Sequence, residues 1–505
     1  MELALARRRP PASTTSASTK ATRRPPEITR DVHVSRPPGR TGARKLTFNS
    51  ALAENTFLPC AHVTLAAPMA ESQHAARNPP WIVPAGLVKR SSAGICHTVV
   101  PGSDLSMHTI PRVRSQLGGT CTRGSATARR YRTYPVPPPT HERAAQAVVR
   151  AATVLTPAGP LEDAEVVVDG GVITELRPAT GPPAHAVLAP GFVDLQVNGI
   201  GPVDVAAAAG DDWDVLDRAL LAQGVTTWCP TLVSAPAAAL KASLARVAAA
   251  MGRPPASRPA IAGAHVEGPF LTVPGAHDPA ALRPEVDAAW LGALGPVVRI
   301  VTLAPELPGA LDAVAALTTA GVLVSLGHSA CTAETAVAAA DAGARLVTHF
   351  GNAMGTLHQR APGLVGAALA DERLAVSVVA DLVHVHALFV RAAFAAKGAT
   401  RVVLVTDAVA TGAWDEEPPR LADGTLAGSV LHMDGALSNV VTHCAVSLSD
   451  AVSAASTTPA RLLGLADRGA IEPGRRADLV ALDGVGTGAW RVSAVWVQGQ
   501  PSWPA

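Results

Sequence analysis

Residues 186–199, AVLAPGFVDLQVNG, form an apolar run that ends in the polar side chains Gln196 and Asn198. Seven later segments repeat this pattern, so about eight such runs lie between Val187 and Thr411. They are GVTTWCPTLVS (224–234), AIAGAHVEGPF (260–270), VRIVTLAPE (298–306), GVLVSLGHS (321–329), ARLVTHFGNAM (344–354), LAVSVVADLVHV (374–385) and RVVLVTDAV (401–409). Runs rich in Val, Ile and Leu are typical of strands buried on both faces. In a parallel barrel the chemistry lies at the carboxyl ends of such strands. The series therefore predicts an α/β enzyme built on a (β/α)8 TIM-type barrel.

Alanine-rich stretches between these runs predict the helices of the barrel. We expect them at Asp211–Gln223, Pro236–Met251, Leu311–Ala320, Thr332–Ala342 and His386–Lys397. Thr332 is a candidate N-cap, because its hydroxyl can accept a hydrogen bond from the first turn of the helix.

Both flanks of the barrel region have short alternating strand patterns. Residues 145–186 include EVVVDGGVITELRP with a Gly-Gly turn at Gly170–Gly171, and residues 469–505 include RADLVALDG and RVSAVWVQGQ. A two-residue turn of this kind is typical of a β-hairpin. We expect a small β-sandwich domain built from both flanks, with the barrel at residues 187–468.

Residues 1–144 differ in composition from the rest of the chain. They hold 21 Lys and Arg against 7 Asp and Glu, whereas the other residues hold 21 against 33, so the net charge of +2 conceals a basic start and an acidic remainder. This start lacks sustained hydrophobic periodicity, and we expect it to be disordered. An organellar transit peptide and a basic interaction arm are two interpretations. We favour a third, a translation start placed too far upstream, with the protein beginning near Val148 or Val149.

Composition also argues against several classes of protein. The acidic remainder argues against a nucleic-acid partner, and no apolar stretch is long enough to span a membrane. The six cysteines show no CxxC pairing, which argues against a disulfide framework and fits a reducing, cytoplasmic compartment.

Three candidate metal ligands end three different runs: Glu267, His328 and His349. One carboxylate and two imidazoles form a known catalytic zinc ligand set, and strand ends of a barrel can bring them together. Any one of them alone would more simply be a hydrogen-bonded buried residue; the series argues otherwise.

One metal ion is favoured over two. The first run has Gln196 and Asn198 where two-metal barrel hydrolases have HxH, and the fourth ends in Glu306 rather than a bridging lysine. His384 and His386 form an HVH pair that could mimic a metal site. We expect His386 to begin a helix instead.

Two further side chains are candidates for catalysis. Asp407 ends the last run, where a carboxylate beside a metal-activated water can accept its proton and pass it to a leaving amine. His277, in the loop after the third run, could polarise a carbonyl oxygen. Capping of a loop by Asp407 and a solvated His277 are the structural alternatives.

The order of these motifs resembles the N-acetylglucosamine-6-phosphate deacetylase family of the amidohydrolase superfamily. The resemblance rests on PGFVDLQVNG, HVEGPF, GAHDP, LAPE, GHS, THFGNAM, ADLVHV, VTDA and GTLAGSVLHMD, and covers residues 145–504. It implies the metal ligands and the catalytic acid/base named above. It also implies substrate contacts from Ala276, His277, Asn352, Ala353, Arg360, Asp381, His384, Leu426, Ala427 and Gly428. The segment ADLVHV departs from the family pattern, with Leu382 where glycine is common.

The resemblance implies metal-dependent hydrolysis of the acetamide of N-acetyl-D-glucosamine 6-phosphate, giving glucosamine 6-phosphate and acetate. The galactosamine epimer is the alternative substrate, and a non-catalytic sugar-phosphate sensor is the alternative class. We expect one divalent metal per subunit, zinc first, with Fe2+, Co2+ or Mn2+ as alternatives. The resemblance further implies a homodimer.

Overall fold

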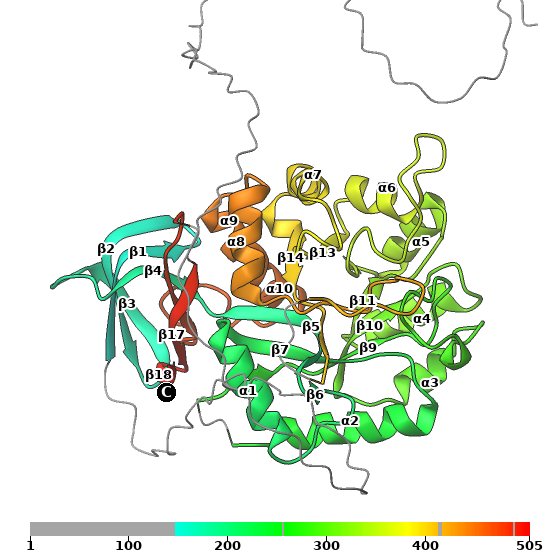
Figure 1. Ribbon diagram of the computed structural model, residues 1–505, viewed down its shortest axis with the longest axis horizontal. Coiled ribbons are helices and arrows are strands. Elements are labelled where there is room, and N and C mark those ends of the chain that lie inside the picture. Colours follow the sequence, from blue (N-terminus) through cyan, green and yellow to red (C-terminus); the bar gives the residue numbers. More distant parts are fainter. Residues whose placement is uncertain (1–146, 255–256, 413–416, 488–489, 505) are drawn as a thin grey trace, which may run out of the picture. The chain divides into compact units, whose positions relative to one another are not determined.

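A computed structural model describes residues 147–254, 257–412, 417–487 and 490–504. The expectations for residues 1–144 lie outside this part of the chain. The described residues alternate strands and helices along most of their length (Figure 1). None of the described helices has the length and apolar character needed to cross a membrane.

The larger of the two main sheets contains the predicted apolar runs. Its order is β14-β13-β12-β11-β10-β9-β7-β5-β15, with β6 added to β5 and β8 to β7. All pairs along this order are parallel. The strands are β5 (Phe192–Gly201), β6 (Val203–Asp204), β7 (Val225–Leu232), β8 (Ala260–Ile261), β9 (Ala264–Glu267), β10 (Val298–Leu303), β11 (Leu323–Leu326), β12 (Leu346–Val347), β13 (Ala375–Val379), β14 (Val402–Val405) and β15 (Ala408–Ala410).

The two ends of this order are consecutive pieces of one segment, residues 402–410. β14 pairs with β13, and β15 pairs with β5, the first strand of the series. Between them the backbone N–H of Asp407 donates to the carbonyl of Gln196 at 2.9 Å. The last run therefore contacts both the seventh and the first run, and it carries Asp407 at the point where it passes from one to the other.

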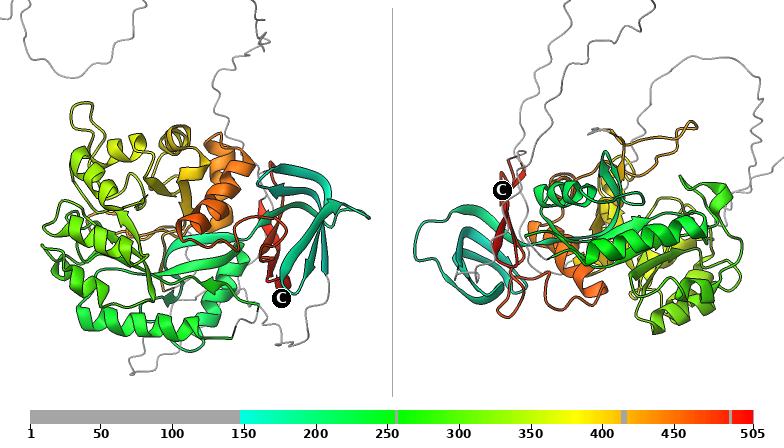
Figure 2. Two further views of the ribbon diagram at one scale, coloured as in Figure 1. Left: turned by 180° about the vertical axis from the view of Figure 1, so that it is seen from behind. Right: turned by 90° about the horizontal axis from the view of Figure 1, so that it is seen from below.

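Helices connect successive strands of this sheet, as the sequence predicts, and lie along its outer side (Figure 2). They are α1 (Asp212–Ala222), α2 (Ala237–Met251), α3 (Ala288–Gly292), α4 (Ala310–Thr319), α5 (Ala333–Ala342), α6 (Gly363–Ala370), α7 (Ala387–Lys397), α8 (Met433–His443), α9 (Leu448–Val452) and α10 (Thr458–Leu462), with short 3-10 or π segments at Pro279–Ala281, Ala399–Arg401 and Ser453–Thr457. The Thr332 side chain caps α5 by accepting from the N–H of Thr335. The His386 side chain caps α7 by accepting from the N–H of Leu388, so His386 begins a helix as expected.

The flanks of the chain meet in a second sheet of order β18-β17-β16-β4-β1-β2-β3. Figure 1 shows strands from the start and the end of the described chain side by side, and Val480 of β16 pairs with Ala189 of β4. The strands are β1 (Ala147–Thr156), β2 (Gly159–Asp169), β3 (Val172–Pro178), β4 (His185–Pro190), β16 (Leu479–Asp483), β17 (Arg491–Val497) and β18 (Gln500–Trp503). The flanks thus combine, but as one hydrogen-bonded sheet, so the two-layered sandwich stays a prediction.

The first apolar run passes from one sheet to the other at Gly191. Residues up to Pro190 belong to β4, and Phe192 begins β5. A Cβ atom at Gly191 would lie 2.2 Å from Thr226 Oγ1, far inside van der Waals contact. Glycine is therefore required where the chain crosses so close to β7.

Two clusters of buried side chains form the core, and the larger one also includes Val480 and Val495 of the flank sheet. The larger cluster includes Phe192, Trp228, Phe270 and Phe350, and a smaller cluster lies in the flank sheet around Ile173. The cysteines Cys229, Cys331 and Cys444 are buried and free.

Candidate metal centre and active site

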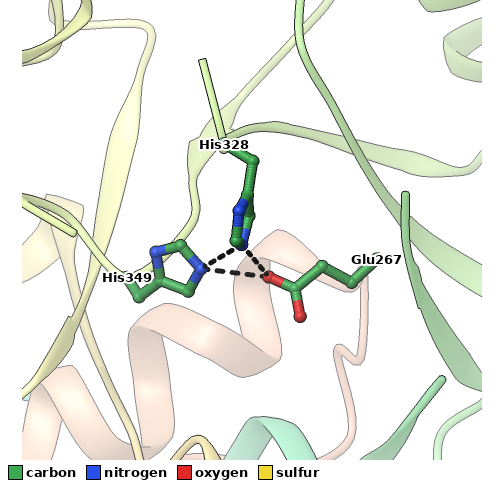
Figure 3. A group of neighbouring side chains, drawn as sticks. All are labelled: Glu267, His328 and His349. Atoms are coloured by element: carbon green, nitrogen blue, oxygen red, sulfur yellow. Dashed lines mark hydrogen bonds and ion pairs between the residues drawn. The ribbon is translucent and has the colours of Figure 1, made fainter. Parts of the chain in front are cut away.

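Glu267, His328 and His349 come together at the carboxyl ends of β9, β11 and β12, three strands of the larger sheet. Glu267 is the last residue of β9, and the histidines follow β11 and β12 by two residues. His349 Nε2 lies 3.0 Å from Glu267 Oε1 and 3.0 Å from His328 Nε2, and His328 Nε2 lies 3.3 Å from Glu267 Oε1 (Figure 3). All three side chains are buried. The predicted ligands are therefore one cluster.

The orientation of the His328 ring suits a bound cation. His328 Nδ1 lies 2.8 Å from the carbonyl of Val273, which can only accept, so Nδ1 carries the proton and Nε2 keeps its lone pair. That lone pair faces a carboxylate oxygen and the Nε2 of His349. One carboxylate oxygen and one imidazole nitrogen from each histidine thus converge, and all three would be acceptors toward a bound cation. Tetrahedral zinc with bonds of about 2.0–2.1 Å separates neighbouring ligands by roughly 3.3 Å, close to the observed spacing.

Both histidines of this cluster, and the neighbouring Asp407, have strained backbone. His328, His349 and Asp407 have φ values of 49°, 30° and 49°. Left-handed conformations cost non-glycine residues free energy, and they persist where the surrounding structure imposes them, often at functional sites. In the neighbouring loops Ala353 and Leu382 have φ values of 50° and 63°, so Leu382 adopts a conformation that suits the glycine common in the family.

Asp407 is buried beside the cluster and is held by one amide. The Asn198 Nδ2 group donates to Asp407 Oδ1 at 2.8 Å. Burial, and then the negative charge of Glu267, raise the pKa of Asp407 to about 6. A carboxyl group whose pKa lies near neutrality can both accept and return a proton, as general acid–base catalysis requires.

A buried carboxylate beneath the site links its two sides. Asp194 accepts from the backbone N–H of Gln196 at 3.1 Å and from the Thr406 hydroxyl at 2.6 Å. Burial raises the pKa of Asp194 to about 7. The Gln196 amide in turn lies 3.3 Å from both carboxylate oxygens of Glu267. Asp194 therefore fixes the residues that precede Asp407 relative to the strand that carries Gln196 and Asn198.

His277 lies at the edge of the cluster with its ring fixed. Its Nδ1 accepts from the backbone N–H of Ser234 at 3.3 Å and lies 2.8 Å from the Ser234 hydroxyl. Burial lowers the pKa of His277 to about 4, so the ring is neutral and carries its proton on Nε2. This Nε2 lies 3.9 Å from Glu267 Oε2 and can donate to an oxygen in the cavity.

A cavity of about 520 Å³ opens over these side chains. Among the residues predicted to contact substrate, its lining includes Ala276, His277, Asn352, Ala353, His384, Leu426, Ala427 and Gly428, together with Asn198 and Asp407. Six lining residues escaped the sequence analysis: Asp204, Val233, Gly275, Val409, Ala410 and Thr425. Gly275 and Thr425 lie within the motifs GAHDP and GTLAGSVLHMD, whereas the other four had only their proximity to strand ends as a signal.

Two predicted contacts lie outside the lining of this cavity. Arg360 is exposed, and its backbone N–H donates to His358 Nδ1. Asp381 contacts a lining residue instead of the cavity: its carboxylate lies 2.6 Å from Nδ1 of His384 and orients that ring.

His265 and Glu306, two other polar residues near strand ends, are hydrogen-bonded to the surrounding structure and do not line the cavity. Both ring nitrogens of His265 are engaged, by the carbonyl of Leu195 and the hydroxyl of Thr302. Glu306 accepts from the Ser329 hydroxyl at 2.7 Å and from the N–H of Ala330 at 2.9 Å.

Parallel strands that carry acidic and imidazole side chains at their carboxyl ends define an α/β enzyme suited to metal-dependent hydrolysis. Residues 187–501 match the Amidohydrolase family. The chain belongs to this family, whose members are metal-dependent hydrolases.

Two sequence relatives within the family are named as sugar-phosphate deacetylases. An N-acetylgalactosamine-6-phosphate deacetylase of Escherichia coli O157:H7 is 39% identical over 381 residues, which are 70% of this chain and 98% of the relative. An N-acetylglucosamine-6-phosphate deacetylase of Bos taurus is 37% identical over 351 residues, 63% of this chain and 83% of the relative.

A solved structure agrees with these sequence relatives. It shows a mutant N-acetyl-D-glucosamine-6-phosphate deacetylase of Mycobacterium smegmatis in complex with N-acetyl-D-glucosamine-6-phosphate. It has 32% identity and a TM-score of 0.64, and the match covers 71% of this chain and 99% of that one. The likeness supports the predicted TIM-type barrel architecture.

Proposed function

We propose that this chain hydrolyses the acetamide of N-acetyl-D-glucosamine 6-phosphate to glucosamine 6-phosphate and acetate. One observation carries the proposal: the three mutually facing acceptors of Glu267, His328 and His349 share a single cavity with Asp407. The volume of that cavity suits a phosphorylated sugar. The names of the relatives support the substrate class.

The three acceptors would hold one divalent cation. When bound, such a cation supplies Lewis-acid chemistry, which lowers the pKa of water and polarises a carbonyl oxygen. Asp407 accepts the proton of the attacking water and then donates it to the amine nitrogen as the C–N bond breaks. The Asn198 amide holds Oδ1 of Asp407, which leaves Oδ2 to carry the proton.

His277 stabilises the negative charge that develops on the acetamide oxygen. Its neutral ring presents Nε2–H to the cavity because Ser234 occupies Nδ1. A fixed donor aimed at a developing oxyanion lowers the barrier for acyl transfer. The sugar phosphate would contact Ala276, Asn352, Ala353, His384 and the 426–428 segment, with Arg360 and Asp381 as further predicted contacts.

Several finer features belong to the same proposal. We infer that β5 to β15 close a (β/α)8 barrel, supported by the contact of residues 402–410 with both β13 and β5. We place the barrel at residues 187–468 and the flank domain at 145–186 and 469–505. Zinc is the proposed cation, because its known catalytic sites use this ligand set. The resemblance supports a homodimer, and the buried free cysteines support a reducing, cytoplasmic compartment.

A second substrate is favoured by one comparison. The relative from Escherichia coli O157:H7 acts by its name on N-acetylgalactosamine 6-phosphate and is matched over 98% of its length. The two sugars differ in the orientation of one hydroxyl, so the same metal centre and the same acid/base would serve both.

The test is a deacetylase assay on the full chain with both epimers, combined with metal analysis of the same sample. We expect one divalent cation per chain and a higher kcat/KM for the glucosamine derivative. A higher value for the galactosamine derivative would select the second substrate. Protein that holds no metal and releases no acetate from either sugar would overturn the proposal.

A further inference from the structure

A second cavity, of about 380 Å³, lies at the amino ends of the strands that carry the active site. Its lining residues are Leu323, Arg345, Glu372, Arg373, Ala375, Thr400, Arg401, Arg461 and Leu462. Leu323 and Ala375 are the first residues of β11 and β13, and Arg345 and Arg401 immediately precede β12 and β14. Since these strands are parallel, this arginine cavity lies at the end of the sheet opposite the metal centre.

Four guanidinium groups against one carboxylate make the lining strongly basic. Two of the four are already neutralised. Arg373 is held by Asp371, with Nη2 2.6 Å from Oδ2, and also pairs with Asp341. Arg401 Nη2 lies 3.1 Å from Glu372 Oε2.

The other two cations, Arg345 and Arg461, donate to backbone carbonyls. Arg345 donates from Nη1 to the carbonyls of Ala340 and Ala344 at 2.8 and 2.7 Å, and Arg461 donates from Nη2 to the carbonyl of Thr400 at 2.5 Å. Within the described part of the chain, neither forms an ion pair with a carboxylate. Each guanidinium group therefore keeps donor nitrogens that are not used by these bonds.

We propose that this arginine cavity is a second ligand site that binds a small phosphomonoester, with Arg345 and Arg461 as its anion ligands. A phosphomonoester carries about −1.5 to −2 charges near pH 7, which matches two unpaired guanidinium groups. The fork of a guanidinium fits phosphate oxygens in pairs. The cavity volume admits a molecule of sugar-phosphate size, and Glu372 and Thr400 supply an acceptor and a hydroxyl for its polar groups.

This site is separate from the proposed active site and does not depend on deacetylation. From Leu323 to Leu326, β11 rises only about 10 Å, so one strand would contact a ligand region at each end. Inorganic phosphate and a sugar phosphate share the recognised group, and the experiment distinguishes them.

The experiment is calorimetric titration of the metal-loaded full chain with inorganic phosphate and, separately, with glucosamine 6-phosphate at low ionic strength. The variants are Arg461→Gln, Arg345→Gln and the double variant. Arg391→Gln is the matched control, since Arg391 is an exposed arginine on α7 outside this cavity. Thermal melting of each protein identifies any variant that fails to fold, and Arg461→Gln alone carries the test if Arg345→Gln, which loses bonds at the end of α5, does not fold.

We expect one class of phosphate sites to weaken at least tenfold in Arg461→Gln and to disappear in the double variant, with Arg391→Gln unchanged. Tighter binding of glucosamine 6-phosphate than of inorganic phosphate would assign a sugar phosphate; equal binding would assign phosphate alone. Isotherms that are the same in the wild type and in folded Arg461→Gln would overturn the proposal. Loss of deacetylase activity would bear on the proposed function only, because the arginine cavity is identified by the class of binding sites that the arginine variants lose.

Discussion

The two ends of β11 to β14 differ in how their polar groups are satisfied. At the carboxyl ends, His328, His349 and Asp407 have left-handed backbone, and buried imidazole and carboxylate groups cluster together. At the amino ends, Lys397 and the arginines donate to carbonyls and carboxylates. Backbone strain and buried clusters of ionisable groups are destabilising, so a fold retains them where they serve a ligand or a reaction. The difference predicts that substitutions at the carboxyl ends impair activity, whereas substitutions at the amino ends impair stability.

The largest effect is expected for Asp407→Asn. The amide cannot accept the proton of water, so kcat should fall by about 10²–10⁴-fold while the protein stays folded and keeps its metal. The measurement is acetate release together with metal analysis. Glu306→Gln is the matched control, because Glu306 also follows a strand of the larger sheet, β10, yet its carboxylate is bound by Ser329 and Ala330. Near-normal turnover in Asp407→Asn would remove Asp407 from the mechanism.

The buried acid Asp194, which holds the segment before Asp407, should make the stability of the protein depend on pH. Its pKa is raised to about 7, so between about pH 4 and pH 7 the folded chain keeps a proton that the unfolded chain has released. The contribution of this proton to stability is fully present below about pH 4 and is lost as the pH rises through about 7.

In Asp194→Asn this contribution should disappear from the pH profile. The difference in unfolding free energy between wild type and variant should change by about 1.4 kcal/mol per pH unit across the interval, or about 4 kcal/mol in all. Denaturant unfolding at a series of pH values measures it. Parallel profiles for the two proteins would show that Asp194 is ionised in the folded chain at every pH tested.

Cation binding should stabilise only a protein with an intact acceptor cluster. After treatment with a chelator, adding Zn2+ to about 100 times its Kd should stabilise the wild type by about 2.7 kcal/mol, seen as a rise in Tm. His328→Ala should lose this response. His386→Gln, which changes a helix cap away from the cluster, should keep it. An equal rise in His328→Ala would place the cation elsewhere.

Much of the fold follows from hydrophobic period and caps alone. The five predicted helices match α1, α2, α4, α5 and α7 to within a residue or so at each end, because each lies between apolar runs and two of them, α5 and α7, have side-chain caps. The three acceptors Glu267, His328 and His349 were also predictable, since parallel strands bring their carboxyl ends to one edge.

Other features depend on packing between segments that are distant in the sequence. The split of the first run at Gly191 follows from the side chain of Thr226, which no local pattern reveals. The support of His277 by Ser234, and of Asp407 by Asn198, requires the register between strands. Arg360 fits a phosphate by its chemistry, but its position depends on the loop after β12, where sequence periodicity carries no information.

The amino-end half of the comparison is tested by Lys397→Met, for which the smallest effect is expected. The Lys397 ammonium is buried and donates to the carbonyl of Asp371 at 2.6 Å, which joins the end of α7 to the loop before β13. Methionine keeps the length of the side chain but loses the charged donor, so stability should fall by about 1–2 kcal/mol. Since no atom of this contact faces the active-site cavity, kcat/KM should equal that of the wild type. Urea unfolding and steady-state assays measure the two effects, and a loss of activity without a loss of stability would show that the two ends of the strands are not separable.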